Sequence, residues 1–238
     1  MALLATSPAI DAGDDAVLSA PYNLTTDQRG VHRPNGFHVD IGAFEFGSTI
    51  LVTTLNDSGG GSLRQAILSA ATGDRILFTS LVTGTIGLTT GELLINKLLN
   101  IIGPGASVLT ISGNQSSRVF HVNASGNLNM FGLTLANGLA RGADGGPDSA
   151  GNYNIGGGIL NEGTSALTDC VITNNRVIGG NGGNAVQFFA GGAAGNASGG
   201  GVYNSGLMVL LRCTVSGNSV QGGNGGNGLP FSFFNLYS

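Results

Sequence analysis

Gly156-Gly157-Gly158-Ile159-Leu160-Asn161 returns 43 residues later as Gly199-Gly200-Gly201-Val202-Tyr203-Asn204. The offset continues without a gap through Leu167 and Leu210 and through the tracts 179–184 and 222–227. A fixed period that keeps apolar, Asn and Gly positions in phase is typical of stacked-repeat proteins. In such a stack, each strand pairs in parallel with the matching strand of the next coil, about 4.8 Å away.

The composition of the 238-residue chain favours an all-β fold. Hydrophobic residues make up 41% and charged residues only 9%, whereas disordered chains are poor in apolar residues and rich in charge. Short Val, Ile, Leu and Thr runs divided by Gly and Asn indicate strands and turns. The sequence therefore predicts a parallel β-helix, a solenoid, whose Gly-rich inserts at 138–155, about 179–198 and from 222 onward are surface loops.

One short helix is predicted over residues from about 62 to 71. Ser62 and Gln65 have the form of a capping box, with a hydroxyl at the N-cap and a Gln three residues later. Apolar residues follow at helical spacing at Leu63, Ala66, Ile67 and Ala70. We expect this helix to cover the first open end of the core, with coils from about residue 74.

Positions in phase predict three side-chain ladders: Asn161 with Asn204, Asn175 with Asn218, and Cys170 with Cys213. Asn residues at a bend can stack their amides along the axis of the stack. The two cysteines are expected to be neighbours within disulfide range. They are two reduced thiols in an apolar ladder, a disulfide, or part of a metal site. The metal site is the weakest of these, because no His or further Cys is in phase.

Several stretches resemble one family, at Gly59–Ile67, Gly73–Phe78, Ile102–Gly105 and Leu109–Asn114. They are similar to the start of large secreted bacterial proteins with a right-handed parallel β-helix. The Gly-Gly-Gly-Ile/Val and Ser-Gly-Asn coil pattern resembles, more distantly, that of polymorphic outer-membrane proteins. The resemblance implies a right-handed β-helix domain over residues 48–238, truncated at its C-terminal end.

The first part of the chain resembles the other end of such an array. Ser7–Asp11, Asp27–Gly30 and Asp40–Glu45 are similar to the segment that closes a β-helix before a surface-anchoring element. Residues 1–47 are therefore expected to be the closing segment of a preceding array. The chain as a whole would then be a piece of a longer tandem protein, with signal and anchor outside it.

The net charge and the motifs of the chain argue against several classes of function. A net charge of −4 and a single lysine, Lys97, argue against nucleic-acid binding. No apolar run approaches the ~18 residues of a transmembrane segment. No carboxylate repeats among the coils, and no Gly-x-Ser-x-Gly motif occurs. No catalytic, cofactor-binding or metal-binding residue is predicted, and no cofactor is expected.

These observations favour a non-catalytic module, secreted or at the cell surface, that is adhesin-like or structural. We expect its loops to bind polysaccharide or cell-surface glycans, and its ends to meet neighbouring β-helix modules of the same longer chain. The alternative is a polysaccharide-degrading enzyme, a lyase or glycosidase, since β-helices also carry such activities by analogy of fold. That chemistry needs paired carboxylates from nearby coils, which missing coils would supply.

Overall fold

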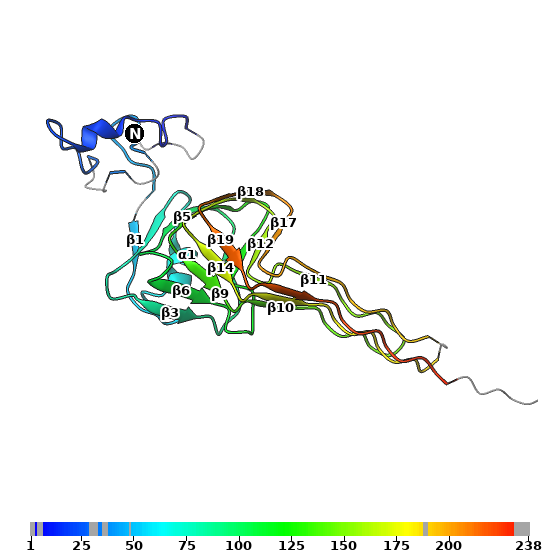
Figure 1. Cartoon of the computed structure of the whole chain (residues 1–238). Coiled ribbons are helices and arrows are strands. Elements are labelled where there is room, and N and C mark those ends of the chain that lie inside the picture. The colour runs from blue at the N-terminus through cyan, green and yellow to red at the C-terminus, as the bar shows by residue number, and fades with distance from the viewer. Residues whose placement is uncertain are drawn as a thin grey trace, which may run out of the picture.

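The computed structural model describes residue 3 and residues 7–28, 33–34, 38–47, 49–187 and 190–230. Within these ranges the protein consists of short parallel strands with one α-helix and one 3-10 helix. The fold is therefore all-β and built from parallel sheets, which is compatible with a parallel β-helix. Figure 1 shows a stack of strands, a smaller N-terminal segment beside it and a long arm that leaves it.

Three sheets form the body, and the chain passes through them in turn. The first sheet contains β1 (Thr49–Val52), β2 (Arg75–Phe78), β5 (Leu98–Ile102), β8 (Asn127–Phe131), β13 (Thr164–Thr168) and β18 (Leu207–Leu211). The second contains β3 (Gly84–Gly87), β6 (Leu109–Ser112), β9 (Thr134–Ala136), β14 (Val171–Thr173) and β19 (Thr214–Ser216). The third contains β4 (Leu93–Ile95), β7 (Phe120–Val122), β12 (Ile159–Asn161) and β17 (Val202–Asn204). We refer to one passage through the three sheets as a rung.

Strand pairing between the last two rungs follows the 43-residue sequence repeat. Ile159 pairs with Val202 in the third sheet, and Leu167 pairs with Leu210 in the first. Earlier rungs follow the same register, and the first sheet stacks Ile76, Ile101, Met130, Leu167 and Leu210 in one column. The first four of these side chains are at most 3% exposed and Leu210 is 41% exposed. Burying each such side chain stabilises the fold by about 1.5–3 kcal/mol.

Helix α1 (Leu63–Ser69) covers the start of this core, where it contacts β1, β2 and β4. Ser62 Oγ accepts a hydrogen bond from Gln65 N at 3.2 Å, which satisfies one free N–H at the helix start. The helix is shorter than the expected range of 62–71. It ends early because Asp74 Oδ2 binds Ala71 N at 2.7 Å and Gly73 turns the chain with φ of +91°.

Asp57 links the loop before the helix to the first rung through hydrogen bonds. Its Oδ2 accepts hydrogen bonds from Thr90 Oγ1 at 2.7 Å and Thr89 N at 2.9 Å, while Arg64 Nη2 lies 2.7 Å from Oδ1. Burial raises the pKa of this carboxyl, but the hydrogen bonds outweigh burial and lower the pKa to about 2. The sequence offered no sign of this role, because Asp57 looked like an ordinary turn residue.

The N-terminal segment lies beside β1 and outside the stack of rungs (Figure 1). It contains the 3-10 helix η1 (Asp15–Leu18) and is organised around buried carboxylates. Asp40 accepts hydrogen bonds from Asp11 N at 2.8 Å and Phe46 N at 2.5 Å, and Glu45 pairs with Arg33 at 3.3 Å. Of the expected Asp27–Gly30 motif, the last two residues lie outside the described ranges.

The Gly-rich inserts differ most from expectation, because they are not separate loops. The inserts contain β10 (Leu139–Arg141), β11 (Asn154–Ile155) and β16 (Ala197–Ser198), and β15 (Arg176–Ile178) and β20 (Ser219–Gln221) lie directly before the second and third inserts. The chain leaves the rungs along 139–148, 176–187 and 219–230 and returns along 149–155 and 190–198. We call these five stretches legs, and together they form the arm. Figure 1 shows the legs running side by side away from the rungs.

Candidate functional site

Legs that run outward are joined by backbone hydrogen bonds at every third residue. Between the first two outgoing legs these bonds are Gly142 N to Ile178 O (2.8 Å), Gly145 N to Asn181 O (2.7 Å) and Asp148 N to Asn184 O (3.1 Å). Between the second and third they are Gly179 N to Gln221 O (2.9 Å), Gly182 N to Asn224 O (2.8 Å) and Ala185 N to Asn227 O (2.8 Å). A three-residue period is typical of extended helices with three residues per turn.

Returning legs are bonded to outgoing legs through the next glycine of each triplet. Gly180 N donates to Asn152 O at 2.8 Å, and Gly183 N donates to Ser149 O at 2.9 Å. A Cβ at Gly180 would lie 1.9 Å from Ala143 O, and one at Gly183 would lie 1.8 Å from Gly146 O. Backbone therefore packs directly on backbone. This close approach explains why the tracts repeat glycine, which a flexible loop does not require.

The third residue of each triplet supplies a side chain that completes the bonding. Asn181 Oδ1 accepts from Asn224 N and Asn184 Oδ1 accepts from Asn227 N, both at 2.9 Å. In the first leg Asp144 takes the same position, and its Oδ1 accepts from Asn181 N at 2.8 Å. That hydrogen bond, aided by Arg141, holds the pKa of Asp144 below its usual range. The arm is thus an ordered extension of the rungs that carries polar side chains outward.

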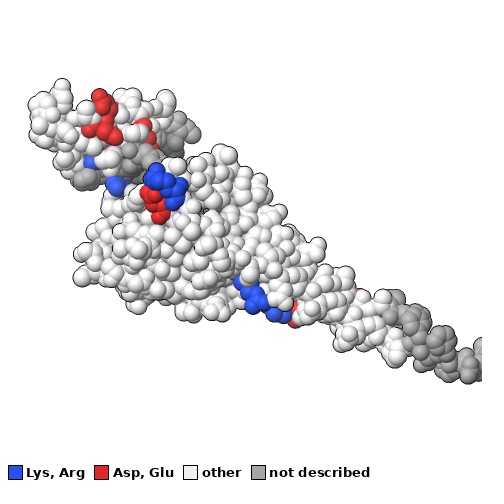
Figure 2. Space-filling view, viewed as in Figure 1, with Lys and Arg blue, Asp and Glu red and all other residues white. Residues whose placement is uncertain are grey.

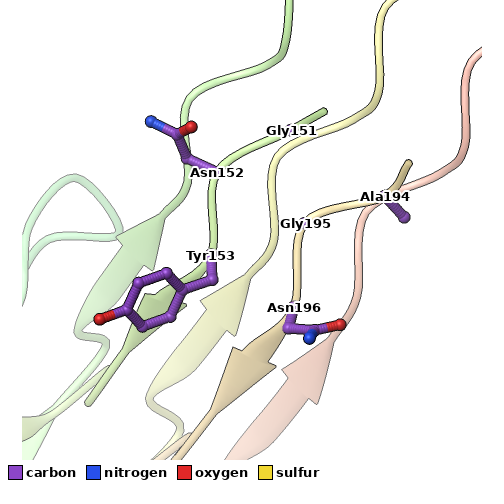
Figure 3. A pocket seen from close by; sticks show the side chains of 6 residues that line it. All are labelled: Gly151, Asn152, Tyr153, Ala194, Gly195 and Asn196. Carbon is purple, nitrogen blue, oxygen red and sulfur yellow. The ribbon is translucent and has the colours of Figure 1, made fainter. Parts of the chain in front are cut away.

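A shallow hollow lies on the returning legs and is lined by Gly151, Asn152, Tyr153, Ala194, Gly195 and Asn196. Figure 3 shows Asn152 and Tyr153 on one leg and Ala194 and Asn196 on the next. Asn154 N donates to Asn196 O at 3.1 Å, which fixes the two legs beside each other. Tyr153 is 66% exposed and follows the exposed Asn152 on the same leg, while the exposed Asn196 on the next leg points to the other side in Figure 3.

This arrangement is suited to a sugar ring. The face of a tyrosine packs on the C–H side of a pyranose, and its hydroxyl can form hydrogen bonds. Asn side chains supply both donors and acceptors for sugar hydroxyls. Tyr153 is not part of a ladder that the sequence repeat predicts, because Asn196 stands at the matching position of the next repeat. The stretch Asn152-Tyr153-Asn154, an aromatic flanked by amides, was the available signal.

A second polar cluster lies on the outside of the third sheet. His121 Nδ1 is 3.1 Å from Glu92 Oε1, and His121 Nε2 is 3.0 Å from Glu162 Oε2. The other oxygen of Glu92 pairs with Arg118, which also donates to Ile155 O at 2.8 Å. The cluster therefore links three rungs and the base of the arm. Its two glutamates share no repeat phase, so the sequence alone did not bring them together.

The predicted ladder residues lie in adjacent rungs. Asn161 Nδ2 donates to Asn204 Oδ1 at 2.6 Å, and Asn175 Nδ2 donates to Asn218 Oδ1 at 3.0 Å. Asn175 is fully buried, and its Oδ1 also accepts from Gly138 N at 2.7 Å. The Asn175 amide therefore connects the rungs to the turn at which the arm begins.

Cys170 and Cys213 are free thiols in the structure. Cys170 Sγ lies 3.3 Å from Thr168 O, and Cys213 Sγ lies 3.3 Å from Leu167 O. Burial raises the pKa of the Cys170 thiol to about 11, so this thiol is protonated and unreactive at neutral pH. The geometry is that of two thiols packed in an apolar ladder.

Charge is sparse over the face of the molecule in Figure 2, with charged side chains on the N-terminal segment, on the body beside it and at the base of the arm. Within the described ranges, no helix is long and apolar enough to cross a bilayer. In the same ranges, no group of three or more His, Cys, Asp or Glu side chains is arranged to hold a metal ion. Comparisons with protein families, curated proteins and solved structures find no match.

Proposed function

We propose that this protein is a secreted or cell-surface module, a right-handed parallel β-helix, that binds glycans without cleaving them. The resemblance of its coil motifs to secreted bacterial β-helix proteins supports the location and the adhesin-like role. Crossovers between parallel strands are right-handed in nearly all proteins, which supports the hand. The rungs are the scaffold, and the arm displays the binding surface away from it.

The hollow beside Tyr153 is the observation that carries this proposal. It combines an exposed aromatic face with the amides of Asn152 and Asn196 on a rigid, backbone-bonded support. A rigid support reduces the entropy lost on binding, which favours even a small site. The expected ligand is a neutral polysaccharide segment or cell-surface glycan that packs one ring against the tyrosine.

A glycan array probed with the whole chain tests this function. Tyr153→Ala should weaken binding to the strongest glycan by roughly tenfold, which is ~1.4 kcal/mol. Tyr22→Ala is the matched control, because Tyr22 is similarly exposed at 64% but lies in the N-terminal segment. Equal binding by wild type and Tyr153→Ala would contradict the hollow as the site. Release of reducing or unsaturated sugars would contradict the non-catalytic role.

The cluster around His121 favours one alternative, a polysaccharide-cleaving enzyme. Two carboxylates flank one imidazole on the outer face, and general acid–base cleavage of a glycosidic bond uses such groups. The side chains of Glu92 and Glu162 are 32% and 43% exposed, so substrate could reach both. A degradation screen with wild type and Glu162→Gln distinguishes the two functions. Sugar release that the substitution abolishes would support the enzyme.

A further inference from the structure

A separate groove lies at the base of the arm. It has a volume of about 300 Å³, at the small end of the range of ligand sites. The lining includes Gln115, Asn137, Asn174, Arg176, Gly217 and Ser219. The hollow beside Tyr153 is formed by the returning legs, whereas this groove lies where the outgoing legs leave the second sheet. The two sites share no lining residue.

The corner of this groove repeats from rung to rung. Asn137, Asn174 and Gly217 occupy the same position of three successive rungs and all have left-handed backbone, with φ of 52°, 53° and 64°. Adjacent rungs are held in register there by Arg176 N, which donates to Gly138 O at 2.8 Å, and Ser219 N, which donates to Asn175 O at 2.9 Å. Polar groups therefore line the corner at intervals of roughly one strand spacing, ~4.8 Å. An extended ligand can lie along such a corner.

Arg176 gives the groove its charge. Its side chain is exposed, and its Nη2 contacts the Gln221 amide oxygen of the next rung. Among the described residues, no carboxylate pairs with Arg176. The other arginine of the outgoing legs, Arg141, pairs with Asp144 at 3.1 Å. A guanidinium without a carboxylate partner in a polar groove is suited to bind an anion.

We propose that this groove binds a carboxylate-bearing saccharide of the uronic acid type. The planar guanidinium of Arg176 matches a carboxylate in two parallel hydrogen bonds. Asn174, Gln115 and Ser219 supply donors and acceptors for neighbouring hydroxyls. One cation among amides and hydroxyls fits a sugar carboxylate better than a phosphate, which proteins bind with several donors or cations at once. The site goes beyond the proposed glycan hollow and takes a different chemical class of ligand.

Calorimetry on the whole chain tests this with a trisaccharide of galacturonic acid and its methyl ester as probes. The acid should bind at least roughly tenfold more tightly than the ester at low salt, because only the acid carries a carboxylate. Arg176→Gln should remove that difference, and Arg176→Lys should retain part of it. Arg141→Gln is the matched control and should leave binding of the acid unchanged, as should Tyr153→Ala.

Three results would overturn the proposal: equal affinity for acid and ester, full binding by Arg176→Gln, or equally effective competition by acetate, which indicates a site for any small carboxylate. Because Arg176 is exposed, its variants are expected to fold, and circular dichroism verifies this. A failure of the uronic acid site can be told apart from a failure of the proposed function, because the proposed function depends on Tyr153 and on neutral glycans.

Discussion

The rungs and the arm share one sequence period but are stabilised in different ways. In the rungs, apolar side chains stack in buried columns, and Leu135 and Ile172 are fully buried neighbours in the second sheet. In the arm, Gly180 and Gly183 let one backbone lie directly against another. The first arrangement depends on burying side chains, and the second depends on glycines, which have none, at the points of closest approach. The same parallel register therefore supports two kinds of packing in one molecule.

A core truncation should show the largest effect. Leu135→Ala removes a fully buried side chain from the second sheet and should lower the free energy of unfolding by about 2–5 kcal/mol. Thermal and urea unfolding measure this loss, and the arm should unfold with the rungs that hold it. Leu94→Ala is the control, because Leu94 is 46% exposed. A loss as large in the control would show that burial does not set the difference.

The joint between rungs and arm is tested by Asn175→Ala. The substitution removes the buried hydrogen bonds of Asn175 with Gly138 N and Leu135 O, at an expected cost of about 2–4 kcal/mol. Urea unfolding gives the value. Asn174→Gly serves as control, since Asn174 is exposed and glycine keeps its left-handed backbone accessible. If both variants were equally stable, the buried amide would have no role at the joint.

Acid should loosen the first rungs as the pH falls toward 2. The folded pKa of Asp57 is about 2, below the usual value near 4 for an aspartate. The stabilisation, about 2 kcal/mol, is therefore complete above pH 4 and is lost as the pH falls through 2. Hydrogen exchange of residues around α1 as a function of pH measures this. Asp57→Asn should be less stable at pH 7 and lack the acid transition, whereas an unchanged transition would assign it to other carboxyls.

The arm should respond to glycine substitution without loss of the rungs. Gly183→Ala places a Cβ against Gly146 O and should separate legs locally, raising exchange of arm amides by roughly tenfold, ~1.4 kcal/mol. Gly146→Ala is the matched control, because nothing lies within 4 Å of its added Cβ. Hydrogen exchange and the melting temperature separate the two regions. If Gly183→Ala melted the rungs as well, the two regions would be one cooperative unit.

Sequence alone predicted much of the body of the fold. The phase of Ile159 with Val202, the parallel pairing it requires and the short helix after Ser62 all follow from side-chain patterns. Apolar and Asn residues recur at a fixed period because each side chain packs against the equivalent side chain of the next rung. The binding surfaces were less accessible to this reasoning, since Tyr153 and Arg176 do not recur.

Tertiary structure alone decided the form of the inserts. Glycine has no side chain to signal which neighbour it faces, so the tracts 179–184 and 222–227 are equally compatible with loose loops and with bonded legs. The choice depends on backbone hydrogen bonds between legs far apart in the chain. The cluster of Glu92, His121 and Glu162 was likewise decided by tertiary structure. The three residues come together through the lengths of the inserts and the register of the sheet, and no pattern in the sequence predicts either.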